Sequence, residues 1–231
     1  MRRWLPLLFL AFPLQAQEVD LELVLLADAS GSITQFEVEF QRQGYAAAIT
    51  HPDVLHAISS TLTGSIAVTY VEWAANQATV VDWTIIDSDS AALGFAEAVL
   101  APPRLAYGRN AIGAALLEGK RQIEQNRITG SRRVIDFSGD SIGNFSGPSI
   151  AAARAEVLAA GITINGLPIL CRDCAGRAGP GLEQDYAEQI IGGPGAFVVT
   201  ADGRDSFAAA VRRKLILEIA GITPAATARV P

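Results

Sequence analysis

The chain has 231 residues, of which 50% are hydrophobic and 7% are aromatic. This length is enough for one large domain or a small pair, and the composition is that of an α/β protein rather than a disordered chain. With 24 acidic residues against 18 lysines and arginines, the formal charge is −6. An acidic surface argues against a protein that binds nucleic acid and against one that docks on anionic membranes.

Residues 1–16 are typical of a secretory signal peptide. Two arginines precede an apolar run from Trp4 to Leu14, and the small residue Ala16 fits a cleavage site. An apolar run of this length is too short to span a membrane as a helix. We therefore expect a mature chain that begins near Gln17 and is periplasmic or secreted. Loss of the two arginines moves its formal charge from −6 to −8.

A hydrophobic stretch from Val19 to Leu26 opens the mature chain, and its unbroken apolar end predicts a strand buried on both faces of a parallel sheet. Three oxygen-bearing side chains follow at every second position, namely Asp28, Ser30 and Ser32. One carboxylate and two hydroxyls suit Mg²⁺ or Mn²⁺ better than zinc. The alternative is a polar turn whose short side chains cap the next helix.

The next elements follow from hydrophobic periodicity. The pattern predicts an amphipathic helix from Ile33 to about Thr50 and a short helical piece at 53–60. Two β-rich runs at 65–74 and 77–86 predict a hairpin at one edge of the sheet, because only two residues join them. A helix is expected from Ser88 to Leu100, where two prolines end it.

Asn110 lies in the glycine-containing segment that follows these prolines. Its side-chain oxygen can ligate a hard cation. Asn is also a favoured helix cap, and Ile112, Leu116 and Ile123 form an apolar face behind it. The residues alone leave both roles open.

Asp140 follows a predicted strand that begins at Arg132. In a parallel sheet, the turns after this strand and after the first strand emerge at the same carboxyl edge, so Asp140 should lie near Asp28. Asp136 interrupts the apolar run inside the strand. A buried carboxylate needs a partner, and Arg132, Arg133 or another hydrogen-bonding group could serve.

The remaining pattern continues the alternation of helices and strands. It predicts a helix from Pro148 to Gly161, a strand at 162–169, a short helix at 182–191, a strand at 196–200 and a helix at 205–220. We expect an α/β fold with a doubly wound, mostly parallel sheet flanked by helices. The domain should cover residues 17–221, and residues 222–231 should form a flexible tail.

Cys171 and Cys174 are the two cysteines. In an exported chain a disulfide is the default for such a pair. Zinc would need two further soft ligands, and the two histidines lie far away in the sequence. Proline before the pair and glycines after it favour a small disulfide-closed loop over a redox motif at a helix start.

The Asp28–Ser32 turn after a hydrophobic first strand resembles the metal-ion-dependent adhesion site of von Willebrand factor type A domains. That family draws ligands from an Asp-x-Ser-x-Ser turn, a later Thr and a later Asp. Asn110 stands at the Thr position, and Asp140 stands at the later Asp position. The resemblance implies a Rossmann-like type A fold and a Mg²⁺ or Mn²⁺ site made by Asp28, Ser30, Ser32, Asn110 and Asp140. It also implies a protein partner that presents Asp or Glu.

Within that superfamily, residues 134–144, the cysteine-containing loop and the ending at 201–221 resemble a bacterial exported group, the DUF1194 proteins. Two other functions stay open: a metal-dependent hydrolase, and a structural module with a degenerate metal site. The sequence has no Gly-x-Ser-x-Gly, His-Glu-x-x-His or phosphate-binding glycine-rich lysine motif. We therefore expect a binding module rather than an enzyme.

Overall fold

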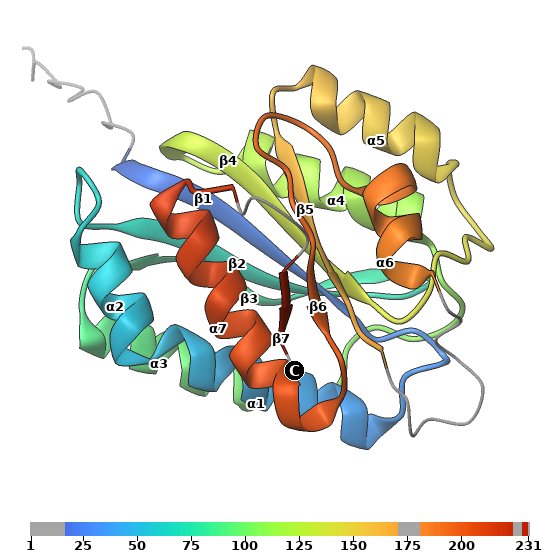
Figure 1. Cartoon of the computed structure of the whole chain (residues 1–231), viewed down its shortest axis with the longest axis horizontal. Helices are drawn as coiled ribbons and strands as arrows, with labels where there is room; N and C mark the ends of the chain where they lie inside the picture. Colours follow the sequence, from blue (N-terminus) through green and yellow to red (C-terminus); the bar gives the residue numbers. More distant parts are fainter. Residues whose placement is uncertain (1–16, 171–180, 224–227, 231) are drawn as a thin grey trace, which may run out of the picture.

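In the computed structural model, residues 17–170, 181–223 and 228–230 are described (Figure 1). The expected signal peptide and both cysteines lie outside these residues. The centre of the fold is a five-stranded sheet. Its order is β3 (Gln77–Ile86), β2 (Ile66–Trp73), β1 (Gln17–Asp28), β4 (Ile128–Gly139) and β5 (Thr163–Pro168).

Four strands of this sheet run parallel, and β3 pairs antiparallel with β2 at the edge. The expected edge hairpin is therefore confirmed. The central strand β1 lies between β2 and β4, and its successive side chains enter opposite cores. Leu23 and Leu25 join one hydrophobic cluster, whereas Val24 and Leu26 join the other. This explains why the strand reads as a continuous apolar run.

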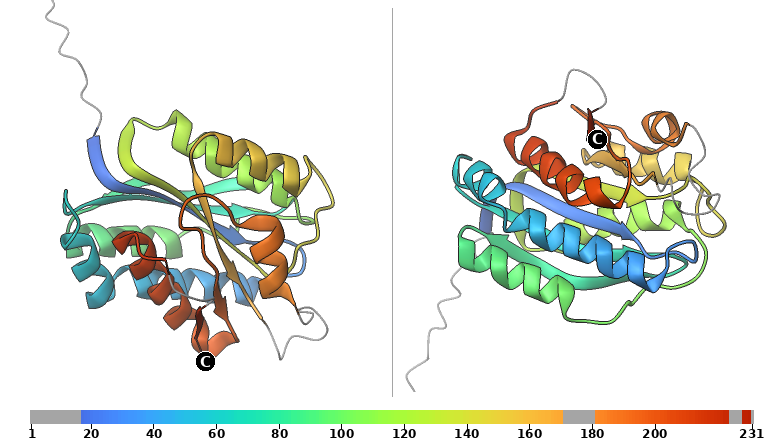
Figure 2. Two further views of the ribbon diagram at one scale, coloured as in Figure 1. Left: turned by 45° about the horizontal axis from the view of Figure 1, so that its top comes forward. Right: turned by 60° about the horizontal axis from the view of Figure 1, so that its bottom comes forward.

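Helices cover both faces of the sheet, which confirms the doubly wound α/β architecture (Figure 2). One face carries α1 (Gln35–Ile49), α2 (Pro52–Ser59), α3 (Asp89–Leu100) and α7 (Arg204–Ala220). The other carries α4 (Ile112–Gln125), α5 (Ile150–Ala159), α6 (Leu182–Asp185) and the π-helical turn η1 (Tyr186–Ile190). None of the helices within the described ranges is long and apolar enough to cross a membrane.

A second, two-stranded sheet forms from β6 (Val199–Ala201) and β7 (Ala228–Val230). It lies beside β5, because single bridges join Gly166 to Val198 and Ile169 to Ala201. Residues 228–230 were expected to belong to a loose tail, and they instead pair in parallel with β6. An unpaired strand edge offers backbone partners to any nearby extended segment. Three residues are too few to give a periodic signal in the sequence.

Asp136 lies in the sheet beneath α7, and its partner is Lys214 rather than Arg132 or Arg133. Lys214 Nζ is 2.8 Å from Asp136 Oδ2, and both side chains are fully buried. Along a strand Arg132 is about 13 Å away, and Arg133 faces the opposite side of the sheet. The guanidinium of Arg132 instead donates to two carbonyls near the end of α7, those of Glu218 and Ile219.

Glu218 shares the same lysine and completes a buried charged cluster, which we define as Asp136, Lys214 and Glu218. The Lys214 ammonium also donates to Glu218 Oε1, and Asn165 Nδ2 donates to that oxygen at 2.9 Å. One cation thus serves two buried carboxylates. Burial raises the pKa of Glu218 to about 7 and also raises the pKa of Asp136, although Lys214 opposes both shifts.

This cluster predicts that stability falls as the pH rises. The pKa of Glu218 increases from 4.5 to about 7 on folding, so between these values the folded state binds more protons than the unfolded state. In EDTA, wild type should lose stability between pH 5 and pH 8, with at most about 3 kcal/mol from Glu218. Glu218→Gln should reduce this loss in urea denaturation, whereas the exposed Glu124→Gln should not. Equal pH slopes in all three proteins would contradict the assignment.

Candidate metal centre

Four of the five expected site residues meet where β1 and β4 end. Asp28 is the last residue of β1, and its Oδ1 accepts the Ser30 N–H at 2.8 Å. The hydroxyl oxygens of Ser30 and Ser32 are 3.1 Å apart. Ser32 Oγ donates to Asp140 Oδ1 at 3.1 Å, and the Asp140 N–H donates to Asp28 Oδ2 at 3.4 Å. Residues more than 100 positions apart thus form one hydrogen-bonded group.

Asn110 joins this group through the residue after Asp140. Its buried side chain donates from Nδ2 to Ser141 Oγ at 2.8 Å. The alternative that Asn110 caps α4 is wrong, because the N-cap is Ala111 and no side chain of the cap residue makes a capping bond. The Gly113 N–H at this helix start instead donates to Asn144 Oδ1 at 3.2 Å.

The alternative for the Asp28–Ser32 turn, that its short side chains cap the following helix, is also wrong. Thr34 is the N-cap of α1, and it forms a capping box with Glu37. The Glu37 N–H donates to Thr34 Oγ1 at 3.2 Å, and the Thr34 N–H donates to Glu37 Oε2 at 2.7 Å. The oxygens of Asp28, Ser30 and Ser32 are therefore not used to start the helix.

The two carboxylates of this group are almost completely buried, with exposed fractions of 1% for Asp28 and 5% for Asp140. Burial and the charge of Asp140 raise the pKa of Asp28 to about 7, although hydrogen bonds from two backbone N–H groups lower it. No basic side chain of the described residues forms a hydrogen bond or ion pair with the Asp28 carboxylate. A cation between the two carboxylates would relieve their repulsion.

The chemistry of the donors fits a hard cation. Within the described residues, no group of three His, Cys, Asp or Glu side chains could hold a metal ion. Any metal here must therefore also use neutral oxygens, and the hydroxyls of Ser30 and Ser32 lie beside the two carboxylates. A set made only of oxygens favours Mg²⁺ or Mn²⁺ over metals that prefer sulfur and imidazole.

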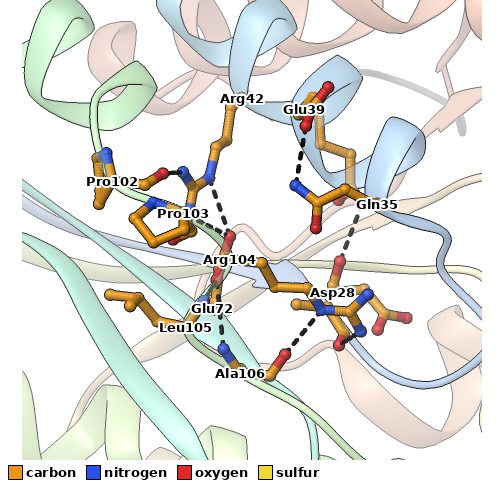
Figure 3. A network of polar contacts seen from close by, with 12 residues as sticks. Asp28, Gln35, Glu39, Arg42, Glu72, Pro102, Pro103, Arg104, Leu105 and Ala106 are labelled. Atoms are coloured by element: carbon orange, nitrogen blue, oxygen red, sulfur yellow. Dashed lines mark hydrogen bonds and ion pairs between the residues drawn. The ribbon is translucent and has the colours of Figure 1, made fainter.

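Arg104 binds the inner side of the site loop, which is residues 28–34. Its guanidinium donates to the carbonyls of Ala29, Ser30 and Ile33, and the Ser30 and Ile33 contacts measure 2.9 and 3.0 Å. Its Nε also donates to the Ala106 carbonyl at 2.8 Å (Figure 3). One planar cation thus joins several carbonyls of the site loop to the segment before Asn110.

A buried ion pair behind the site loop fixes the segment that carries Arg104. Arg42 donates to Glu72 Oε1 from Nε at 2.9 Å and from Nη2 at 2.7 Å. Arg42 also donates to the carbonyls of Pro102 and Pro103, and Glu72 Oε2 accepts the Leu105 N–H at 2.7 Å (Figure 3). The positions of α1, β2 and the 101–109 segment are therefore coupled directly behind the site.

The sequence interpretation missed Arg42, Glu72 and Arg104. Glu72 carried a usable signal, since a carboxylate inside the apolar run of β2 requires a buried partner. Arg104 carried no such signal, because it lies in an irregular segment and its acceptors are backbone carbonyls.

Residues 18–223 match the model of a family described as "Protein of unknown function (DUF1194)". No curated protein matches the chain. The match to the family model covers nearly all of the part that was expected to form the domain.

Solved structures share the fold at low sequence identity. The pilus adhesin SpaC from Lactobacillus rhamnosus GG is 14% identical with a TM-score of 0.64, covering 89% of this chain and 31% of the adhesin. A von Willebrand factor type A protein from Catenulispora acidiphila is 16% identical with a TM-score of 0.58, covering 87% of this chain and 43% of that protein.

A third similar structure is proximal thread matrix protein 1 from the mussel byssus, described with a zinc-occupied MIDAS motif. It is 14% identical with a TM-score of 0.60, and the match covers 87% of this chain and 46% of the mussel protein. The chain spans less than half the length of each of these three proteins. The similarities confirm the type A fold.

Proposed function

Because the chain belongs to the DUF1194 family, whose description assigns no activity, we propose a function from its site. The protein is an exported, non-enzymatic binding module that holds Mg²⁺ or Mn²⁺ at an adhesion-type site and binds an acidic side chain of a partner protein. The observation that carries this proposal is the hydrogen-bonded group of two buried carboxylates and two hydroxyls at the carboxyl edge of the sheet.

Each site residue has a distinct part in the proposal. Asp28 and Asp140 supply the negative charge that attracts the cation, and Ser30 and Ser32 supply neutral hydroxyl ligands. Asn110 supplies an amide oxygen from the segment before α4. The two carboxylates would balance the charge of a divalent cation and the other ligands are neutral, so the cation could still take a carboxylate of the partner as a further oxygen ligand.

The comparisons support this function at the level of the fold. One of the similar proteins is described as an adhesin, and another is described with a metal-occupied MIDAS motif. The hydrolase alternative receives less support. His51 caps α2 and His56 lies within it, which places both histidines at the opposite end of α1 from the site loop.

A displacement experiment with Mn²⁺ tests the proposed function. Protein loaded with Mn²⁺ should enhance the relaxation of water protons, and a peptide that contains glutamate should lower this enhancement by replacing metal-bound water. The same peptide with glutamine in place of glutamate is the matched control. Equal effects of the two peptides would contradict carboxylate binding.

We expect Arg104→Ala to weaken Mg²⁺ binding about 10- to 100-fold, because groups that orient metal ligands contribute that much to affinity. Arg104→Lys should not restore it, since an ammonium cannot serve several carbonyls as a planar guanidinium does. Arg109→Ala is the control: Arg109 is exposed, and its guanidinium carbon lies 3.9 Å from the centre of the Phe145 ring. Equal affinities of the Arg104 and Arg109 variants in calorimetry would contradict a role in positioning the loop.

Export of the protein rests on the signal-like residues 1–16. We expect intact-mass measurement of the exported protein to give a chain that begins near Gln17. An exported chain that still begins with Met1 would contradict cleavage after Ala16.

A further inference from the structure

Tyr186 lies directly beneath the proposed metal site and opens the π-helical turn η1. Its side chain is fully buried, and its ring centre is 5.8 Å from that of Phe137. Its hydroxyl is buried too, and it has no hydrogen-bond partner among the described residues. A buried unpaired hydroxyl costs about 1–3 kcal/mol, and π-helical turns are frequent at functional sites. Both features indicate that the hydroxyl has a function that the metal-free structure does not use.

Gly139 shows where this hydroxyl points. A Cβ atom placed on Gly139 would lie 2.9 Å from Tyr186 Oη, 2.9 Å from Asp28 Oδ2 and 2.9 Å from Trp73 Cζ2. The phenol oxygen and the carboxylate oxygen therefore both lie next to this Cβ position beside the β4 backbone. The two oxygens are at most twice 2.9 Å apart. Any side chain at position 139 would separate them, so glycine keeps this contact region open.

The phenol is a hydrogen-bond donor at neutral pH, where tyrosine stays protonated. The charged groups nearest to it, Asp28 and Asp140, are acceptors. The Asp28 carboxylate already accepts one N–H on each oxygen, and each oxygen has capacity for a further bond.

We propose that Tyr186 is a positioning residue of the metal site, whose hydroxyl donates a hydrogen bond to the Asp28 carboxylate in the metal-loaded protein. This inference rests on the proposed function and assigns a role to a residue outside the five ligands. A donor behind a ligating carboxylate fixes its orientation and holds its charge in place. The hydroxyl thereby gains in the loaded state the partner that it lacks in the metal-free fold.

The test is Tyr186→Phe, which removes only the hydroxyl. In EDTA this variant should unfold at the same temperature as wild type or higher, because no hydrogen bond is lost and an unpaired polar group disappears. Its dissociation constant for Mg²⁺ should rise about tenfold in calorimetry. The affinity should thus fall without any loss of stability, which a merely structural tyrosine would not produce.

Tyr45→Phe is the matched control, because Tyr45 of α1 is also buried, but in the hydrophobic core on the other face of the sheet. It should leave the Mg²⁺ affinity unchanged. An unchanged affinity of Tyr186→Phe, with wild type binding Mg²⁺, would overturn this inference alone. Loss of stability of Tyr186→Phe in EDTA would also overturn it, since the hydroxyl would then have a partner without metal. A wild type that binds neither Mg²⁺ nor Mn²⁺ would remove the proposed function as well.

Discussion

Replacing Lys214 by methionine should lower the free energy of unfolding by about 3–5 kcal/mol at pH 8. In the described structure, Asp136 and Glu218 both form their ion pairs with Lys214. Each of the three residues is at most 2% exposed. Methionine fills similar space but carries no charge, so two carboxylates would stay buried without a cation. Urea denaturation in EDTA measures the effect.

Two comparisons separate this explanation from a general effect of losing a lysine. Lys120→Met removes surface pairs with Glu124 and Glu156 and should change stability little. The triple variant Lys214→Met, Asp136→Asn, Glu218→Gln should recover much of the lost stability, because no buried charge remains. The loss in Lys214→Met should also shrink at pH 5, where Glu218 is protonated. Equal losses in Lys214→Met and Lys120→Met would contradict the buried cluster.

Replacing Asp140 by alanine should weaken Mg²⁺ binding about 100-fold or more. This change removes one of the two carboxylates of the site and the acceptor of the Ser32 hydroxyl. It also removes the charge that helps to raise the pKa of Asp28, so that pKa should fall toward its usual value. Calorimetric titration with Mg²⁺ at pH 8 measures the loss. An affinity equal to that of wild type would exclude Asp140 as a ligand.

Two variants of Asn110 test how much this residue contributes to the Mg²⁺ affinity. Asn110→Ala should weaken binding less than Asp140→Ala, because a neutral amide offsets none of the charge of the cation. Asn110→Thr places a hydroxyl at this position and should keep or raise the affinity. A larger loss in Asn110→Ala than in Asp140→Ala would contradict the proposed division of roles.

The parts of the site that were predictable from the sequence are local ones. Asp28, Ser30 and Ser32 follow a strand that reads clearly as buried, and Asp140 follows another such strand. The rule that parallel strands end at one edge of the sheet was enough to bring these residues together, and their hydrogen bonds confirm the proximity.

The parts that were not predictable depend on packing between distant segments. The partner of Asp136 lies on α7, and a strand pattern does not say which helix covers it. Tyr186 was expected only as part of a short helix, because an apolar ring at helical spacing gives no sign of where its hydroxyl points. The cap of α4 comes from Asn144, a loop residue with no fixed spacing from the helix.

Calorimetric titration of wild type with Mg²⁺ in metal-free buffer at pH 8 tests the central claim most directly. At this pH the Asp28 carboxyl, with a pKa of about 7, is largely ionised, so protons compete little with the cation. We expect one site per chain with a dissociation constant of about 1 mM or lower, and Mn²⁺ should compete for the same site. No binding of Mg²⁺ or Mn²⁺ in the millimolar range would contradict the adhesion-type site and leave only the fold.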